Sequence, residues 1–139
     1  MSQDVLPPNP LAPLPSPSDR APLVVGLDLG GTKMAAALVD AGGALQGPVS
    51  SCPTPAHDGP AAMLDAISGL ITKVVGAGTH QEPGSAVPIT AVGIGTAGVV
   101  DVERGAILSA TDAITGWTGT QVAAGIQKRL AAQGLGELP

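Results

Sequence analysis

A glycine pair with an aspartate just before it and a threonine and a lysine just after it constrains this chain more than any other feature. The segment reads GLDLGGTKM and covers residues 26–34. Because glycine has no Cβ and tolerates positive φ, such a turn can align backbone N–H groups as a cradle for phosphate oxygens. The carboxylate of Asp28 would repel the same phosphate. The segment is therefore either an ordinary tight turn with a solvated aspartate, or a phosphate turn in which a divalent cation separates the two charges.

The residues around the turn favour strands on both sides of it. The run LVVGLDL, residues 23–29, is rich in Val and Leu and is bounded by a proline and a glycine, which is typical of a short strand. KMAAALV, residues 33–39, is followed by DAGG, too soon for an average helix. ALQGPV, residues 44–49, is expected to be another short extended segment, so the sequence predicts two successive hairpins.

Two other glycine motifs fail on their context. GIGTAG, residues 93–98, spells G-x-G-x-x-G, but GVVDVERG follows where a dinucleotide site needs a helix, and no acidic residue lies about 20 positions further on. The spacing from Gly26 to Gly31 fits a P-loop, but it continues Thr-Lys where a P-loop has Lys followed by Ser or Thr. A strand, an aspartate, two glycines and Thr-Lys opening a second strand is instead the phosphate hairpin of the actin and hexokinase class.

Two helices and three further strands are predicted downstream. Aliphatic residues recur at helical spacing over residues 61–75, Pro60 suits the first turn, and Asp58 or Gly59 suits the cap. Glycines at positions 76 and 78 are expected to end this helix, followed by a polar loop over residues 79–88. ITAVGI, GVVDV and AILSA indicate strands within residues 89–110. A second helix with Val122, Ile126 and Leu130 on one face would have Thr118 or Thr120 as cap and end at Gly134.

The amino end has a different composition from the rest. Seven of the 14 prolines lie in the first 22 residues, where fixed φ angles and missing N–H donors oppose helix and sheet formation. We expect residues 1–22 to be a disordered leader, with a polyproline ligand segment as the alternative. The folded part is then residues 23–139, one domain at most.

Charge and cysteine content exclude several partners. The formal net charge is -5 with only six Lys and Arg, which leaves no basic patch for nucleic acid or an anionic membrane. Charges and glycines interrupt the apolar run over residues 24–39, so it does not read as a membrane span, and the amino end lacks the features of an export signal. Cys52 is the sole cysteine, so no intrachain disulfide forms, and a reduced, cytoplasmic setting is expected.

The chain resembles the ROK family of sugar kinases and sugar-responsive repressors. The resemblance rests on GLDLGGTKMAAALVDAGG, on PTP at residues 53–55, on ITAVGIGTAGVVD, which is similar to the family's G-x-G-x-P-G-x-V-D, and on GAILSATDAITGW, which is similar to its N-L-x-G-W-like loop. It implies an α/β, ribonuclease-H-like amino-terminal lobe of the actin and hexokinase ATPase type. That lobe would have a mixed β-sheet with helices and would be incomplete here.

The resemblance also assigns roles within the hairpin. It implies ATP as phosphoryl donor, with the N–H groups and the Thr32 hydroxyl on the β and γ phosphates and Asp28 facing Mg²⁺ through water. The implied phosphate-binding set is Gly26, Asp28, Gly30, Gly31, Thr32 and Lys33. For Lys33 the alternative is a side chain that points from the second strand into solvent.

Departures from the family pattern fall on the sugar side. Ala97 stands where the family has proline, and Ala113 where many members have an asparagine near the sugar. Gly98 is the candidate for close backbone approach to the sugar, with a plain turn glycine as an equal alternative. Asp101 and Trp117 match family positions, and we interpret them as a turn-stabilising residue and a loop-packing residue.

The expected general base and zinc cluster of the family lie beyond residue 139. No catalytic residue is therefore assigned within the chain, and no metal role is given to His57, His80 or Cys52. We expect an amino-terminal fragment of an ATP-dependent kinase for a hexose or N-acetylhexosamine, inactive alone and possible as a homodimer only at full length. Two alternatives stay open. One is a non-catalytic ROK-type sugar sensor or regulator. The 22 leading residues are too few for the DNA-binding domain of such a regulator. The other alternative is an interaction module that binds no nucleotide.

Overall fold

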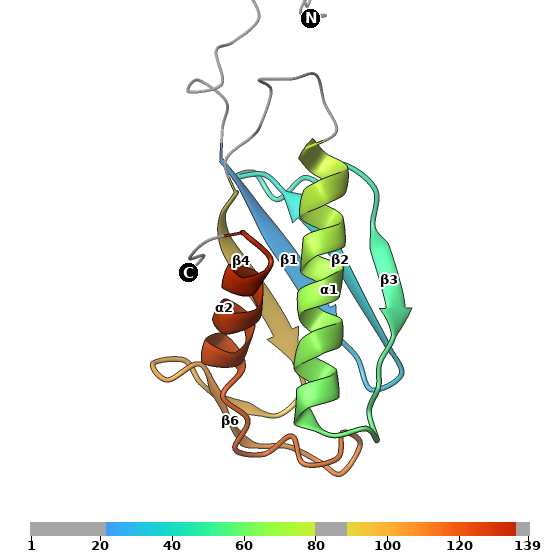
Figure 1. Cartoon of the computed structure of the whole chain (residues 1–139), viewed down its shortest axis with the longest axis vertical. Helices are drawn as coiled ribbons and strands as arrows, with labels where there is room; N and C mark the ends of the chain where they lie inside the picture. Colours follow the sequence, from blue (N-terminus) through green and yellow to red (C-terminus); the bar gives the residue numbers. More distant parts are fainter. Residues whose placement is uncertain (1–21, 80–88, 136–139) are drawn as a thin grey trace, which may run out of the picture.

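The structure is a computed structural model that describes residues 22–79 and 89–135. Residues 1–21 of the expected disordered leader and residues 80–88 of the expected polar loop, including His80, lie outside the described residues. The described chain forms two helices and six strands in an order that alternates strand groups with helices (Figure 1).

Four strands form one mixed sheet. They are β1 (Leu23–Leu29), β2 (Lys33–Val39), β3 (Ser50–Pro53) and β4 (Ile89–Thr96), in the spatial order β3-β2-β1-β4. The first three run antiparallel to their chain neighbours, and β4 pairs parallel to β1. The first expected hairpin and the expected mixed sheet are therefore confirmed.

The second hairpin differs from the expectation in one respect. Its pairing strand is β3 at residues 50–53, whereas within residues 44–49 only Leu45 makes an isolated bridge, to Val39. Gly47 has φ of 115° and Pro48 has no N–H to donate, so this stretch cannot continue a ladder. Asp40 closes the intervening loop through its Oδ1, which accepts the N–H groups of Gly42 and Ala44, both at 2.9 Å.

Helix α1 (Pro60–Thr79) crosses one face of the sheet and makes the parallel connection to β4 possible. Gly59 holds the cap position, since its carbonyl accepts the N–H of Met63 at 3.2 Å. The expectation that glycines 76 and 78 end the helix is wrong, because α1 continues to Thr79. A glycine costs a helix only about 1 kcal/mol, and burial of Val74 and Val75 in the preceding turn outweighs that cost.

Two short strands and a second helix follow β4. They are β5 (Val99–Asp101), β6 (Ala106–Ser109) and α2 (Val122–Ala132), and β5 and β6 form a separate two-stranded sheet. The predicted buried face of α2, made by its first, fifth and ninth residues, is confirmed. Gly134 follows the helix with φ of 79°, as expected for a helix end.

The expected threonine cap of α2 is wrong. Gln121 is the cap residue and its side chain makes no capping hydrogen bond. Instead, the N–H of Ala123 in the first turn donates to the carbonyl of Gly105 at 3.0 Å. A carbonyl from a distant loop therefore satisfies the helix start, and the hydroxyl of Thr118 accepts the N–H of Ala110 instead.

The core lies between the sheet and both helices, which cover the same face (Figure 1). Alternate residues of β1 and β2 point into it, and one face of each helix meets them. The largest fully buried side chains of this core are Trp117, Met34, Met63, Ile67, Ile71, Ile107, Leu130 and Val25.

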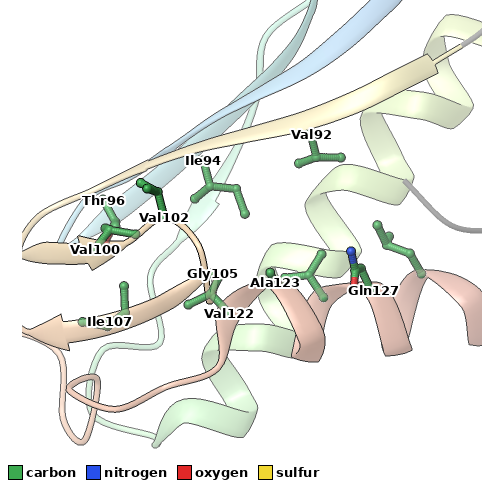
Figure 2. A pocket seen from close by; sticks show the side chains of 12 residues that line it. Val92, Ile94, Thr96, Val100, Val102, Gly105, Ile107, Val122, Ala123 and Gln127 are labelled. Carbon is green, nitrogen blue, oxygen red and sulfur yellow. The ribbon is translucent and has the colours of Figure 1, made fainter. Parts of the chain in front are cut away.

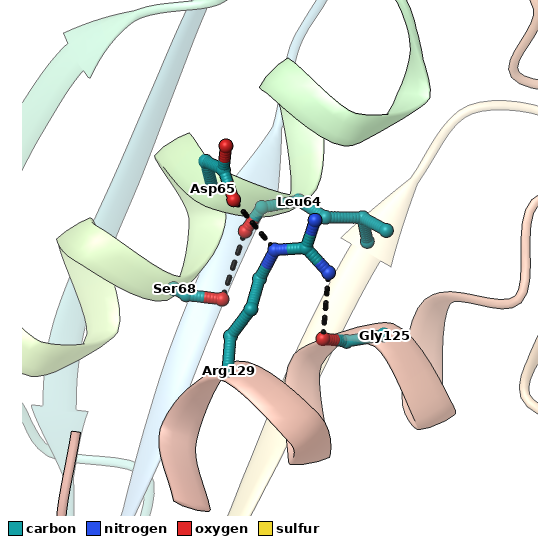
Figure 3. Close-up of polar contacts among 5 residues, drawn as sticks. All are labelled: Leu64, Asp65, Ser68, Gly125 and Arg129. Atoms are coloured by element: carbon teal, nitrogen blue, oxygen red, sulfur yellow. Dashed lines mark hydrogen bonds and ion pairs between the residues drawn. The ribbon is translucent and has the colours of Figure 1, made fainter. Parts of the chain in front are cut away.

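A polar contact joins the two helices on their outer side. Arg129 of α2 donates from Nε to Asp65 Oδ1 of α1 at 2.6 Å, and from Nη1 to the carbonyl of Gly125 at 3.1 Å (Figure 3). Beneath it, the buried Ser68 hydroxyl donates to the Leu64 carbonyl at 2.8 Å, which satisfies a polar group inside the helix interface.

Among the described residues, one helix is long and apolar enough to cross a membrane: α1, over its stretch Pro60–Ala77, of which 44% is buried inside the protein. Its buried positions are those that pack on the sheet, whereas Asp65 and Lys73 lie on its exposed side. That division is typical of the core helix of a globular domain.

Candidate functional site

The turn between β1 and β2 has a shape that requires glycine at its first position. The Gly30 N–H donates to the Lys33 carbonyl at 3.1 Å, which closes the turn. A Cβ added at Gly30 would stand 2.5 Å from that same carbonyl oxygen. The sequence therefore makes a tight hairpin here because residue 30 has no side chain.

The tip of the turn exposes unpaired hydrogen-bond donors. Gly31 and Thr32 are both exposed, and among the described residues neither of their N–H groups donates a hydrogen bond. The Thr32 hydroxyl adds another polar group at the same tip. Such outward N–H groups fit an anion such as a nucleotide phosphate.

Asp28 stands two residues before the turn on the sheet face away from α1. Its neighbours in β1, Leu27 and Leu29, are buried on the helix side, so Asp28 points the other way and is exposed. The paired residues beside it are small, Ala35 in β2 and Gly95 in β4. A hydrated Mg²⁺ would therefore meet no bulky side chain from these partners, and the oxygen donor is the type that Mg²⁺ prefers.

The remaining expected phosphate residues lie on the same sheet face. Gly26 is in the middle of β1, opposite Ala37 and Gly93, rather than in the turn. Lys33 opens β2 and is exposed, and it forms no ion pair with a described residue. The structure thus brings Asp28, the turn and Lys33 to one end of the sheet, with Gly26 further along.

A loop that is distant in sequence approaches the turn. A Cβ added at Gly31 would lie 4.0 Å from the Cβ of Ala113. Trp117 anchors this loop, since it is 1% exposed and its Nε1 donates to the Thr96 hydroxyl at 3.4 Å. The interpretation of Trp117 as a packing residue is confirmed, and residue 113 lies beside the expected phosphate turn.

Gly98 and Asp101 are explained by local geometry. Gly98 has φ of 104°, and a Cβ there would stand 2.5 Å from the Ser109 carbonyl oxygen, so this turn between β4 and β5 needs glycine. Its approach to a sugar stays a prediction. Asp101 Oδ1 accepts the N–H groups of Glu103 and Arg104, both at 3.1 Å, which confirms its role in stabilising the turn.

Thr54 contacts the turn, and sequence reasoning did not assign it a role. It follows β3, its hydroxyl donates to the Gly30 carbonyl at 2.7 Å, and its N–H donates to the Thr32 carbonyl at 2.9 Å. The only signal in the sequence was the PTP match at residues 53–55. A family pattern marks the position, but it does not say which atoms the threonine contacts.

Within the described part of the chain, no group of three or more His, Cys, Asp or Glu side chains is placed to hold a metal. His57 Nδ1 lies 3.4 Å from the Thr115 hydroxyl, and Cys52 is a free, half-buried thiol packed against the core.

A cavity of about 360 Å³ lies between β4 and α2 (Figure 2). Val92 and Ile94 of β4 face Val122 of α2 across it, and Val100 and Ile107 close one end. None of the expected phosphate-binding or sugar-binding residues lines this cavity. Its lining is mainly aliphatic, with Thr96 and Gln127 as its polar side chains, and it contains no Lys or Arg, so it is separate from the candidate site.

Comparisons with known proteins find relatives in sequence and in fold. The sequence model of the ROK family matches residues 24–133. A ROK family glucokinase from Streptomyces griseus, solved in complex with glucose and AMPPNP, is 29% identical with a TM-score of 0.63. The ROK hexokinase from Thermus thermophilus has the same identity and TM-score.

These solved structures are much longer than the chain. The matches cover 78% of this chain but 30% of the glucokinase and 32% of the hexokinase, so the chain spans about a third of their length. A ROK family transcriptional regulator, a homolog of the E. coli MLC protein, has a TM-score of 0.64 at 16% identity, covering 78% of this chain and 26% of the regulator, which shows a shared fold. No curated protein matches the chain closely.

The described sheet, its covering helices and these likenesses confirm the expected α/β fold of an incomplete amino-terminal lobe. Since the family match extends over most of the sequence, the chain belongs to the ROK family.

Proposed function

We propose that this chain is the amino-terminal lobe of an ATP-dependent sugar kinase, which transfers the γ-phosphoryl group of ATP to a hydroxyl of a hexose or N-acetylhexosamine. The observation that carries the proposal is the exposed turn after β1, where two unpaired N–H groups lie close in the chain to the accessible carboxylate of Asp28. The glucokinase neighbour, solved with glucose and AMPPNP, supports a site for sugar and nucleotide together.

Each residue of the turn has a distinct part in binding phosphate. The N–H groups of Gly31 and Thr32 and the Thr32 hydroxyl would contact phosphate oxygens, while Gly30 keeps the turn tight enough to present them. Asp28 would hold Mg²⁺ through water. The cation supplies neutralisation of the phosphate charge that the carboxylate would otherwise repel.

Gly26 and Lys33 complete the proposed phosphate end. Gly26 leaves the sheet face beside Asp28 bare, and the exposed ammonium of Lys33 adds positive charge on that face. Fewer residues of this chain are proposed to contact the sugar. Gly98 is the proposed site of backbone approach, and Ala113 offers only a methyl group next to the turn.

The lobe alone is proposed to be inactive. Proton removal from the sugar hydroxyl needs a positioned base, which typically contributes about 10²- to 10⁴-fold to rate, and the family's base falls beyond residue 139. We also propose a cytoplasmic setting, no nucleic-acid or membrane partner, a homodimer only at full length, and any structural zinc outside these residues.

A non-catalytic sugar sensor is the second candidate, because the ROK transcriptional regulator shares the fold at a TM-score of 0.64. In that case the turn would persist without phosphoryl transfer. Residue 113 is an alanine, where many family members have an asparagine, and this difference is compatible with both a kinase and a sensor. A measurement of kinase activity therefore has to distinguish the two functions.

A graft tests the proposal directly. Residues 23–135 would replace the matching lobe of the Streptomyces griseus glucokinase, with which they are 29% identical. We expect sugar-dependent ADP release from Mg-ATP, and no release from the 139-residue chain alone. Asp28→Ala in the chimera should lower turnover by about 10²-fold or more, since it removes the metal-holding group from phosphoryl transfer.

Asp58→Ala is the matched control, because Asp58 is an exposed aspartate outside the proposed site. It should leave turnover unchanged. A folded chimera that binds glucose but releases no ADP would favour the sensor reading, and an unchanged rate for Asp28→Ala would refute the assigned role of Asp28.

A further inference from the structure

Thr54 holds two carbonyl groups of the phosphate turn from outside the hairpin. Its hydroxyl donates to the Gly30 carbonyl at 2.7 Å, and its own N–H donates to the Thr32 carbonyl at 2.9 Å. These carbonyls belong to the peptide groups before and after the pair Gly31 and Thr32, which forms the tip of the turn. One residue that lies 24 positions from Gly30 therefore restrains both peptide groups that flank the tip of the turn.

Because a peptide group is planar, fixing the Gly30 carbonyl also fixes the direction of the Gly31 N–H. The Gly30 carbonyl and the Gly31 N–H belong to one trans peptide group, in which the oxygen and the hydrogen point in opposite directions. Holding the oxygen against the Thr54 hydroxyl therefore turns the Gly31 N–H away from Thr54. That N–H is exposed and unpaired within the described chain.

The surroundings of Thr54 make it a rigid anchor. Pro53, just before it, pairs with Lys33 in the sheet, and the Thr54 carbonyl accepts the N–H of Ala56 at 2.8 Å. The Ala56 carbonyl in turn accepts the N–H of Thr115 at 2.7 Å, in the loop that carries Ala113. A β-branched side chain on such a backbone has few rotamers, so little entropy is lost in holding its hydroxyl in place.

We propose that Thr54 is a positioning residue for nucleotide phosphate, which aims the Gly31 N–H outward by fixing the Gly30 carbonyl. This inference rests on the proposed function, because it assigns a residue to the same phosphate site. Thr54 itself contacts no phosphate, and it acts only through the peptide group that it orients.

The test uses the 139-residue chain labelled with ¹⁵N and titrated with Mg-AMPPNP, with amide shifts read by NMR. Thr54→Val removes the hydroxyl but keeps the N–H bond to Thr32, whereas Thr54→Ser keeps both. We expect Thr54→Val to weaken binding by about 3- to 10-fold, the value of one lost hydrogen bond, and to shift the Gly31 amide before ligand is added. Thr54→Ser should restore both properties.

Thr90→Val is the matched control, since the Thr90 hydroxyl contacts the Leu23 carbonyl near the start of β1 and not the turn. It should bind Mg-AMPPNP as the unmodified chain does. If Thr54→Val keeps full affinity with a dispersed, folded spectrum, the positioning role is wrong while the phosphate site stands. If the unmodified chain gives no response at the turn, both the proposed function and the role of Thr54 are overturned.

Discussion

Adjacent glycines in the β1–β2 turn should respond in opposite ways to the same substitution. In Gly30→Ala the new Cβ would stand 2.5 Å from the Lys33 carbonyl oxygen, so the two must separate by about 0.5 Å to reach a tolerable 3.0 Å. The carbonyl is backbone and the position of the Cβ is fixed by the backbone, so neither can rotate away, and the closing bond from Gly30 N–H to that oxygen is 3.1 Å long. Loss of that bond together with backbone strain predicts a destabilisation of about 2–4 kcal/mol.

Gly31→Ala provides the control on the next residue. Its Cβ would meet only the Ala113 methyl, at 4.0 Å, and Gly31 is not among the glycines with positive φ. Since the folded turn accommodates the methyl group and the unfolded chain loses freedom, we expect no loss of stability and a gain of up to about 1 kcal/mol.

Urea unfolding followed by tryptophan fluorescence measures both variants. Trp117 is the one tryptophan in the sequence, there is no tyrosine, and the indole is 1% exposed in the folded chain, so its emission reports burial directly. Equal unfolding midpoints for the two variants would refute the described turn, in which a Cβ meets a close backbone contact at Gly30 and open space at Gly31.

Three further perturbations test the rest of the fold. The backbone N–H of Ala44 is the main cause that lowers the pKa of Asp40 in the folded chain. The Asp40 carboxylate therefore stabilises the fold at pH values above the pKa that it has in the unfolded chain, and this stabilisation is lost as the pH falls. Asp40→Ala should lower the urea midpoint at neutral pH, and the two midpoints should converge as the pH falls below about 4. Arg129→Met removes the pair with the largely exposed Asp65 and should cost about 0.5–1 kcal/mol, a loss that shrinks in high salt; an unchanged value would show that the contact contributes nothing in solution. Since β4 is the last strand of its sheet among the described residues, we expect this edge to recruit other chains. Val102→Lys places a charge at an 86% exposed apolar position that lines the same cavity as β4, and it should reduce concentration-dependent association in sedimentation. Unchanged association would refute this position of the contact.

The hairpins and helix faces could be predicted because their signals are local. Aliphatic spacing identified the buried face of α2, and the interval between Gly31 and the next glycines was too short for a helix. The ends of the helices were harder to predict from the sequence. The extent of α1 depends on the burial of Val74 and Val75 just before its glycines. The start of α2 is satisfied by the Gly105 carbonyl, which no pattern near Gln121 reveals.

The candidate site divides in the same way. Asp28, Gly30, Gly31 and Thr32 are adjacent in sequence, so one motif identified them together. Thr54 was missed because its role depends on strand pairing between β2 and β3, which brings it back to the turn. The proximity of Ala113 to Gly31 likewise results from tertiary packing around the buried Trp117 and has no local signature.

Replacement of Mg²⁺ by Mn²⁺ tests whether a metal held by Asp28 accompanies nucleotide phosphate at the turn. With AMPPNP and Mn²⁺, paramagnetic broadening in the amide spectrum of the ¹⁵N-labelled chain should appear first at Gly31 and Thr32, require nucleotide, and be lost in Asp28→Asn. Broadening centred on another part of the chain, or broadening at the turn that persists in Asp28→Asn, would contradict the claim.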